Sequence, residues 1–214
     1  MIQRYGVLGS GQVGQVLAKG LKTHGYQAMI GSRTPAKLAE FGKANGIATG
    51  TFAEVARWAE GLVLAVAGRV AQQALDEAGK SNLKGKLVID ATNPISAEPP
   101  DDGVIHFFTG PNDSLMERLQ KAFPDAKFVK AFNSVGNAFM VNPSFPGGKP
   151  TMFYCGNDAE AKQEVARLLE RFGFELADMG KAAGARAIEP LCQLWCIPGF
   201  LENRWDHAFR LLRK

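Results

Sequence analysis

A glycine-rich turn directly after a short apolar run is the feature that most constrains how this chain can fold. The run Tyr5 to Leu8 leads into Gly9-Ser10-Gly11-Gln12-Val13-Gly14, whose glycines have G-x-G-x-x-G spacing. In that pattern the first glycine makes a tight turn, the second lets backbone approach a pyrophosphate, and the third lets the next helix press on the sheet. Free N–H groups at the helix N-terminus also favour phosphate. The turn therefore predicts a dinucleotide-binding β-α-β unit.

The end of the second expected strand indicates which dinucleotide the turn serves. Chains that bind NAD carry an Asp or Glu about 20 residues after the glycine turn, for the ribose 2′-hydroxyl. Here that position reads Ser32-Arg33-Thr34, with Lys37 close behind, and the first carboxylate of the chain is Glu40. Arg33 can bind a 2′-phosphate through two parallel hydrogen bonds, while the hydroxyls donate and Lys37 adds charge. The sequence predicts NADP(H) rather than NAD(H).

Strands and helices alternate along the chain, which is typical of a parallel sheet covered on both faces. Leu62 to Ala67 is a continuous apolar run, as expected for a central strand buried on both sides. Thr51 and Ser114 each precede a Glu by three residues, which predicts capping boxes at two helix starts. We therefore expect an α/β fold of the Rossmann type, with a doubly wound, mainly parallel sheet.

The chain changes composition near residue 142. Asn142 to Pro150 is rich in Pro and Gly, and it marks the expected boundary between a Rossmann domain (1–142) and a C-terminal extension (143–214). After it, Thr151 to Ala177 reads as one more β-α-β unit, and the chain ends in a helical segment. That segment includes His207 in an expected tail helix and completes the substrate pocket.

Composition excludes several classes of function. The net charge is +4 without a dense Lys/Arg run, so nucleic-acid binding is not expected. No secretory segment and no apolar stretch of membrane-helix length occurs, and the three cysteines lack C-x-x-C spacing. We expect a cytoplasmic protein with no disulfide framework, no metal site, and Cys192 and Cys196 packed in the core.

Several turn sequences together resemble the family of NADP oxidoreductases that depend on the deazaflavin coenzyme F420. Members of this family share a related N-terminal domain with six-transmembrane metalloreductases. The matching segments are Gly9 to Gly14, Gly31-Ser32-Arg33-Thr34, Asp90-Ala91-Thr92-Asn93-Pro94, Val129-Lys130-Ala131-Phe132-Asn133, Gly156 to Ala161 and Ala185 to Pro190. The C-terminal Leu194 to Phe200 has no counterpart that we can assign to deazaflavin binding.

The resemblance implies hydride exchange between NADPH and a flat redox partner such as F420 or a flavin. By position, Gly9, Ser10, Gly11, Gln12, Val13 and Gly14 would hold the pyrophosphate, and Ser32, Arg33, Thr34 and Lys37 the 2′-phosphate. Val66, Ala67, Asn93 and Pro94 would border the path to the nicotinamide, and residues 131–138 would lie beside it.

Hydride transfer between two flat rings needs alignment more than an acid or a base, so no catalytic side chain is predicted. Asn133, Ser134 and Asn137 are candidates to hydrogen-bond the nicotinamide or its partner ring. Trp195 and Phe200 either wall a flat pocket or pack in the core or a dimer interface.

Each of two charged residues has two possible roles. Lys130 lies three residues before Asn133, and it is either a strand-end structural lysine or a proton-handling residue of the hydroxyacid dehydrogenase kind. Glu189 is either a buried acid with a raised pKa or, as we expect, the partner of Arg186 in an ion pair.

The predicted function is an NADPH-dependent reductase of a small-molecule acceptor. An imine or keto-acid reductase and a non-catalytic NADP(H) sensor are the alternatives. The apolar C-terminal segment also predicts a homodimer.

Overall fold

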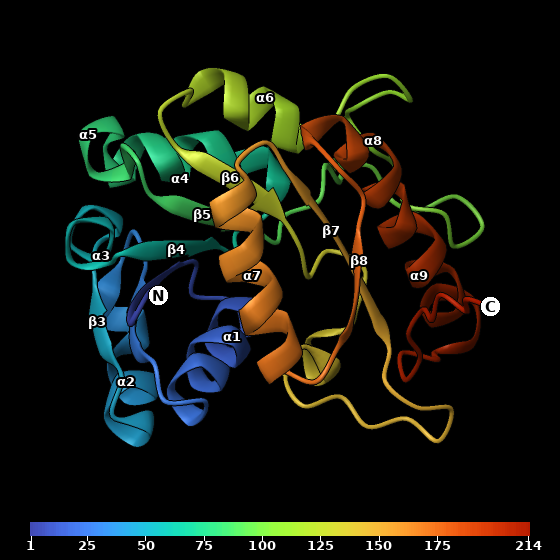
Figure 1. The fold of residues 1–214 in the computed structure, drawn as a ribbon, viewed down its shortest axis with the longest axis horizontal. Coiled ribbons are helices and arrows are strands. Elements are labelled where there is room, and N and C mark those ends of the chain that lie inside the picture. The colour runs from blue at the N-terminus through green and yellow to red at the C-terminus, as the bar shows by residue number, and fades with distance from the viewer.

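Eight strands form one sheet in the computed structural model, which describes residues 1–214, in the order β3-β2-β1-β4-β5-β6-β7-β8 (Figure 1). All neighbouring strands run parallel except β6 and β7, which are antiparallel. The strands are β1 (Arg4–Leu8), β2 (Gln27–Gly31), β3 (Ala48–Gly50), β4 (Gly61–Leu64), β5 (Leu87–Asp90), β6 (Lys127–Lys130), β7 (Thr151–Gly156) and β8 (Glu175–Asp178). The predicted doubly wound, mainly parallel α/β fold is confirmed.

Nine α-helices and four short 3-10 helices connect the strands. The α-helices are α1 (Gln12–Thr23), α2 (Ala39–Asn45), α3 (Phe52–Trp58), α4 (Ala71–Ala78), α5 (Lys80–Leu83), α6 (Leu115–Ala122), α7 (Ala159–Arg171), α8 (Ala185–Ile188) and α9 (Pro190–Glu202). The 3-10 helices are η1 (Pro35–Leu38), η2 (Gly68–Val70), η3 (Asn137–Phe139) and η4 (Ala182–Gly184).

The sheet separates two apolar layers because successive strand residues point to opposite faces. In β4, Val63 packs in the layer that includes α1 and α7, whereas Leu62 and Leu64 pack in the layer that includes α3, α4 and α6. Burying the central strands on both faces is what makes their sequences continuously apolar.

Of the two predicted capping boxes, the one at Thr51 is complete, whereas at Ser114 only the side-chain cap is present. Thr51 Oγ1 accepts from the Glu54 backbone N–H, and the Glu54 carboxylate accepts from the Thr51 backbone N–H at 2.8 Å, which completes a capping box at α3. At α6, Ser114 Oγ accepts from the Glu117 N–H at 3.2 Å.

The C-terminal unit continues the same sheet. β7 and β8 are parallel and are joined by α7, as predicted for a β-α-β unit, and β7 pairs with β6. Both apolar layers contain residues from before and after residue 142. The division at 142/143 stays a prediction.

The end of the chain differs from expectation. Helix α9 ends at Glu202, and residues 203–214 are not helical, so the prediction of a tail helix containing His207 is wrong. Instead this segment returns along the protein: the Thr151 N–H donates to the Phe209 carbonyl at 2.9 Å, and the Leu211 N–H donates to Thr151 Oγ1.

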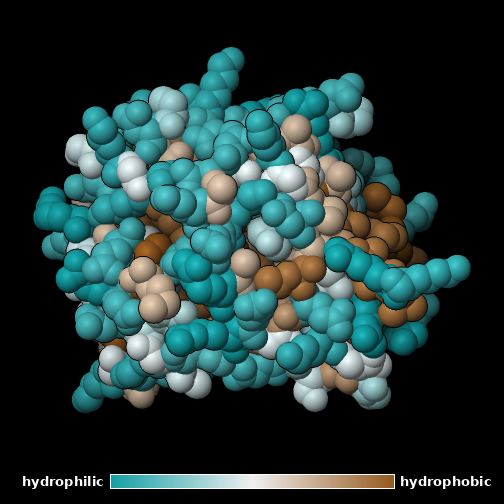
Figure 2. Space-filling model, in the orientation of Figure 1, coloured by the Kyte–Doolittle hydropathy of each residue, from teal (hydrophilic) through white to brown (hydrophobic).

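Helix α9 has an apolar surface that the rest of the chain leaves uncovered. Leu194, Phe200 and Leu201 are about half exposed or more, at 56%, 48% and 61%. Apolar side chains gather on the side of the molecule where α9 and the C-terminal segment lie (Figure 2). The expected homodimer stays a prediction, and this is the surface that it would bury. No helix combines the length and the apolar composition that crossing a bilayer requires.

Candidate functional site

Two cavities lie on either side of the glycine turn, at the carboxyl ends of the strands, where open α/β sheets bind their ligands. The first, of about 290 Å³, is lined by Gly9, Ser10 and Gly11 of the turn. The second, of about 430 Å³, is lined by Gln12 and Val13 from the same turn. We call them the nucleotide cavity and the acceptor cavity. A ligand that spans both must pass over the start of α1.

The three glycines have different surroundings, and each explains one part of the spacing. A Cβ on Gly9 would lie 2.1 Å from the Ala65 carbonyl oxygen, and Gly9 has a φ of +136° that favours glycine. A Cβ on Gly14 would lie 2.0 Å from the Gly9 carbonyl oxygen. A Cβ on Gly11 would meet no protein atom within 4 Å, so the backbone there is open to a ligand.

The nucleotide cavity carries two positive charges that form no ion pair with a carboxylate of the protein. Arg33 and Lys37 line it and are exposed, and neither takes part in any ion pair of the molecule. Thr34 also lines it, and Ser32 is buried with its hydroxyl accepting from the Thr34 N–H at 3.1 Å. The structure thus brings together the four residues predicted for the 2′-phosphate.

The opposite wall of this cavity comes from η2 and α4. Besides the predicted Val66 and Ala67, it contains Val70, Gln73, Ala74 and Glu77, which sequence reasoning missed. These four residues are separated by three, one and three positions, as residues on one face of a helix are, and the segment that holds them comes soon after a central strand. This helical spacing is the sequence pattern from which the wall could have been predicted.

The acceptor cavity is built from segments far apart in the sequence. Its lining includes the predicted Asn93, Asn133, Asn137 and Trp195. Sequence reasoning missed Trp205 and the two α9 cysteines, which we expected in the core. The full lining is Gln12, Val13, Ala91, Asn93, Phe132, Asn133, Val135, Gly136, Asn137, Ala138, Met140, Cys192, Trp195, Cys196 and Trp205.

Aromatic rings from α9 and the C-terminal segment close one side of this cavity. Trp195 and Trp205 lie 5.5 Å apart between ring centroids, and His207 stacks on Trp195 at 5.1 Å. The Trp195 indole N–H donates to the His207 carbonyl at 2.9 Å, which holds the segment in place.

Asn133 lines the acceptor cavity with an unsatisfied acceptor. Its Nδ2 donates to the Ile188 carbonyl at 2.9 Å and to Asn93 Oδ1 at 3.2 Å, and Asn93 Nδ2 donates back to the Asn133 carbonyl at 2.8 Å. Its Oδ1 is buried and has no partner in the protein, and only 4% of the residue is exposed. Because buried polar atoms are almost always paired, this oxygen marks a position for a ligand donor.

The residue before Asn133 is conformationally strained. Phe132 has a φ of +65°, which is unusual for an aromatic residue. Strained backbone of this kind clusters at functional sites, where the surrounding structure maintains it. Here the strain occurs where β6 leads into the Asn133 segment, so it contributes to the placement of that side chain.

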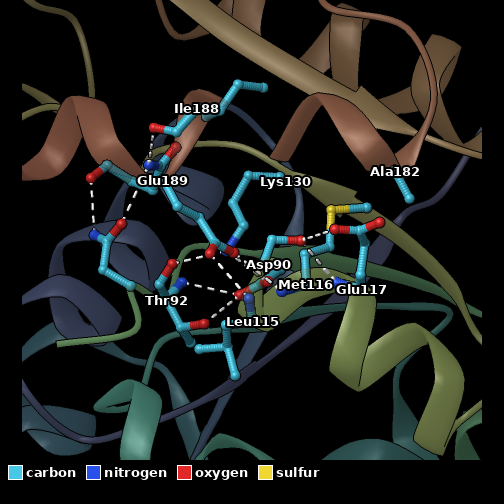
Figure 3. Close-up of polar contacts among 12 residues, drawn as sticks. Asp90, Thr92, Leu115, Met116, Glu117, Lys130, Ala182, Ile188 and Glu189 are labelled. Carbon is cyan, nitrogen blue, oxygen red and sulfur yellow. Dashed lines mark hydrogen bonds and ion pairs between the residues drawn. The ribbon is translucent and has the colours of Figure 1, made fainter. Parts of the chain in front are cut away.

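Asp90, Lys130 and Glu189 form a buried ion cluster (Figure 3). Lys130 Nζ is 2.7 Å from Asp90 Oδ2 and 2.9 Å from Glu189 Oε1, and it donates to the Thr92 carbonyl at 2.8 Å. Burial alone would lower the pKa of Lys130, but the two carboxylates more than offset it and the pKa is raised. Of the two roles left open for Lys130, these contacts favour that of a structural lysine.

The expected ion pair between Glu189 and Arg186 is wrong. Arg186 binds Glu117 instead, at 2.7 Å, and lowers the pKa of that carboxyl group. Glu189 accepts from the N–H groups of Leu115 and Met116 at the start of α6, at 2.9 and 3.0 Å, as well as pairing with Lys130. The cluster thus joins β5, β6, α6 and the start of α9 and fixes the wall that carries Asn133.

Four predicted site residues lie outside both cavity linings, and one of them is Gly14, which faces the Gly9 carbonyl. Pro94 is buried, and its carbonyl accepts from the Phe108 N–H at 2.9 Å. Ser134 is buried at 4% exposure. Phe200 is 48% exposed and contacts Trp205 edge-on, so its assignment as a cavity wall is wrong.

The chemistry that this arrangement allows is binding and alignment. The only charged side chains in the linings are Arg33, Lys37 and Glu77, all around the nucleotide cavity. The acceptor cavity offers apolar and aromatic surface and a few amide groups. Such a lining suits two flat rings held face to face.

Comparison with known proteins connects this site to one family. Residues 4–94 match the model of a family described as NADP oxidoreductase, coenzyme F420-dependent. A solved structure from Arthrobacter sp. FB24, assigned as an F420-dependent NADP reductase, has a TM-score of 0.92 and 33% identity, and the alignment covers 100% of each chain.

Two further relatives share part of their length with this chain. Metalloreductase STEAP3 of Rattus norvegicus is 31% identical over 202 residues, which are 92% of this chain and 39% of the relative. An imine reductase from Streptomyces aurantiacus has a TM-score of 0.64 at 19% identity, with 93% of this chain and 63% of the other covered, which shows a shared fold. The chain thus spans well under half the length of the metalloreductase that it matches.

Proposed function

Because the chain belongs to the family of coenzyme F420-dependent NADP oxidoreductases, we propose that it passes hydride between NADP(H) and a flat acceptor such as F420 or a flavin. The observation that carries this proposal is the pair of cavities flanking one glycine turn. One holds cations that form no ion pair, and the other holds an unpartnered amide oxygen among aromatic side chains.

The residues present fit NADP(H). The Gly11 backbone and the start of α1, which has no acidic residue in its first turn, would face the pyrophosphate. Arg33 and Lys37 would bind the 2′-phosphate. Gln15 supports the turn, because its Nε2 donates to the Ser10 carbonyl at 2.9 Å.

In the acceptor cavity the chain's own residues would orient the rings and exclude water. When bound, NADPH supplies the hydride. Asn133 Oδ1 would accept a hydrogen bond from an N–H group of the nicotinamide carboxamide or of the acceptor ring. Trp195 and Trp205 would cover the cavity and limit access of solvent.

Replacing Arg33 with Asp tests the cofactor assignment. We expect wild-type protein to bind NADPH more tightly than NADH in isothermal titration. Arg33→Asp should weaken NADPH by about 2–3 kcal/mol, the magnitude of a lost charge-assisted contact, while affinity for NADH changes little. Arg57→Asp is the matched control, because Arg57 is exposed on α3 and lines neither cavity. Equal affinity of the wild type for the two cofactors would contradict the assignment.

Replacing Asn133 with Ala tests the acceptor cavity. NADPH oxidation should be followed with F420, FMN, riboflavin and a ferric chelate as acceptors. We expect turnover with a flat ring, and a loss of about tenfold in kcat/KM for Asn133→Ala, as for one hydrogen bond missing from the transition state. Calorimetry with 2′,5′-ADP is the control, because the adenosine end should bind this variant normally.

The same measurements separate the alternatives. Turnover of small imines or keto acids in place of flat rings would favour a reductase of that class, whose fold this chain shares. Direct reduction of the ferric chelate would favour an activity like that named for STEAP3. Tight NADPH binding without oxidation by any acceptor would indicate a sensor.

A further inference from the structure

Two thiols share the wall of the acceptor cavity. Cys192 and Cys196 both line it, and neither forms a disulfide. They are four residues apart on α9, so they lie on the same helix face, with Trp195 between them in sequence and also in the lining. The proposed reaction uses neither thiol.

The two thiols differ in exposure and in character. Cys192 is buried at 6% exposure, whereas Cys196 is half-buried. The neighbouring Cys192 thiol lowers the pKa of Cys196, while Cys196 and burial raise the pKa of Cys192. Cys196 is thus the accessible thiol and the better nucleophile of the pair.

The charged groups around the pair act on Cys192. Lys130 of β6 favours the Cys192 thiolate and Glu189 disfavours it. The neighbouring His207 of the C-terminal segment stacks on Trp195, with its Nε2 2.9 Å from the Trp195 carbonyl oxygen. The pKa of Cys196 therefore depends on the neighbouring Cys192 and on burial, and not on a charged group.

The third cysteine provides an internal comparison. Cys155 in β7 is fully buried and lines neither cavity, and burial raises its pKa to about 12. The acceptor cavity, by contrast, also contains the unpartnered Oδ1 of Asn133, which independently indicates that ligands enter it.

We propose that Cys196 is a covalent modification site for small disulfides that enter the acceptor cavity. The Cys196 thiolate attacks one sulfur of the disulfide, the S–S bond of the reagent breaks, and a new S–S bond forms to Cys196 Sγ. The second sulfur leaves as a thiolate and takes a proton from solvent. The adduct occupies the acceptor cavity and blocks the acceptor, and an added thiol reverses the modification. The predicted loss of turnover rests on the proposed function, whereas the formation of the adduct at Cys196 does not.

The probe is 2-hydroxyethyl disulfide, with intact mass spectrometry and peptide mapping as readouts. We expect one adduct per chain, at Cys196, that dithiothreitol removes. Cys196→Ser should give no rapid adduct. Cys192→Ala should slow the reaction at Cys196 by about tenfold, because the neighbouring thiol that favours the Cys196 thiolate is lost. Cys192→Ser should restore much of the rate, because a hydroxyl at this position can stabilise the neighbouring thiolate.

First modification at Cys155 or Cys192 would overturn the proposal, and so would an unmodified Cys196 under conditions that label free glutathione. If Cys192→Ala does not fold, the rate for Cys192→Ser and the mapping of the wild type still decide it. The modified protein should lose acceptor-linked NADPH oxidation and still bind 2′,5′-ADP. If no acceptor turns over, the proposed function fails while the adduct at Cys196 remains measurable.

Discussion

Gly11 and Gly14 lie three residues apart in one turn, yet they serve different physical needs. Gly14 leaves room for the backbone of Gly9, because a Cβ there would meet the Gly9 carbonyl oxygen at 2.0 Å. Gly11 leaves room for something outside the protein, because a Cβ there would meet no protein atom within 4 Å. A substitution at Gly14 therefore affects folding, and a substitution at Gly11 affects binding.

Alanine at each of these two glycines should separate the two effects. Gly14→Ala should lower the free energy of unfolding by several kcal/mol, at about the level of severe overpacking. Gly11→Ala should keep the stability nearly unchanged and weaken NADPH at least about tenfold, because its methyl group faces the phosphates. Thermal unfolding and calorimetry measure the two quantities. A stable Gly14→Ala variant, or a Gly11→Ala variant with normal affinity, would contradict this division of roles.

At the scale of the elements, carboxylates anchor the starts of three helices. Glu54 at α3, Glu117 at α6 and Asp158 at α7 each lie in the cap or first turn. The pKa of Glu54 is lowered mainly by the Thr51 N–H, that of Glu117 by Arg186, and that of Asp158 by the Ala161 N–H. Each carboxylate also interacts favourably with the positive end of its helix dipole.

These caps predict how stability depends on pH. Because the folded pKa values are lowered, the unfolded chain takes up protons first as the pH falls. The caps stabilise the protein fully above the ordinary carboxyl values of 4.5 for Glu and 3.8 for Asp, and the contribution is lost as the pH falls through the folded values. Urea unfolding between about pH 6 and pH 3 should show this decline. Glu117→Gln should flatten the curve, whereas Asp76→Asn, outside any cap, should not.

A buried ion cluster also determines how α9 packs against the sheet. Lys130, Asp90 and Glu189 are buried together, and each carboxylate accepts further hydrogen bonds. A buried pair of this kind adds little net stability, but removing one partner costs about 3–5 kcal/mol because a buried charge remains. The cluster therefore specifies where α9 packs, and with it the cysteine and tryptophan wall of the acceptor cavity.

For the whole molecule, the sheet and its two apolar layers run without interruption across residue 142. Phe132 contacts Phe172 of the C-terminal unit at a centroid distance of 6.0 Å, and both belong to the layer that contains Val7 and Ile30. The second layer joins Leu8 and Phe52 to Ala182 and Ile188 in the same way. Neither part of the chain completes its own apolar layers.

This continuity predicts one cooperative unfolding transition. Trp58 lies in the first part of the chain, and Trp195 and Trp205 lie in the last. Trp58→Phe therefore leaves fluorescence that reports on the C-terminal part, and the double variant Trp195→Phe, Trp205→Phe leaves fluorescence that reports on the first. Both should unfold at one denaturant midpoint that coincides with the loss of helical circular dichroism, after correction for each variant's stability. Two separate transitions would support independent domains at 1–142 and 143–214.

Much of this protein was predictable from local sequence patterns. The glycine turn, the Ser32-Arg33-Thr34 segment, the helix caps at Thr51 and Ser114, and the apolar strands each depend on residues within about one turn or one strand of each other. Such short-range constraints can be read one segment at a time, because neighbouring residues in the chain are also neighbours in space.

The rest required the tertiary structure, because it depends on which distant segments meet. No local pattern pairs Glu189 with Lys130 rather than with nearby Arg186, leaves Asn133 Oδ1 unpaired, or brings Cys196 and Trp205 to the cavity that Gln12 lines. Those placements follow from the packing of α9 and the returning C-terminal segment against the sheet. The sequence alone determined the fold class and the glycine-turn side of the nucleotide cavity, and only long-range packing decided its α4 wall and the acceptor cavity.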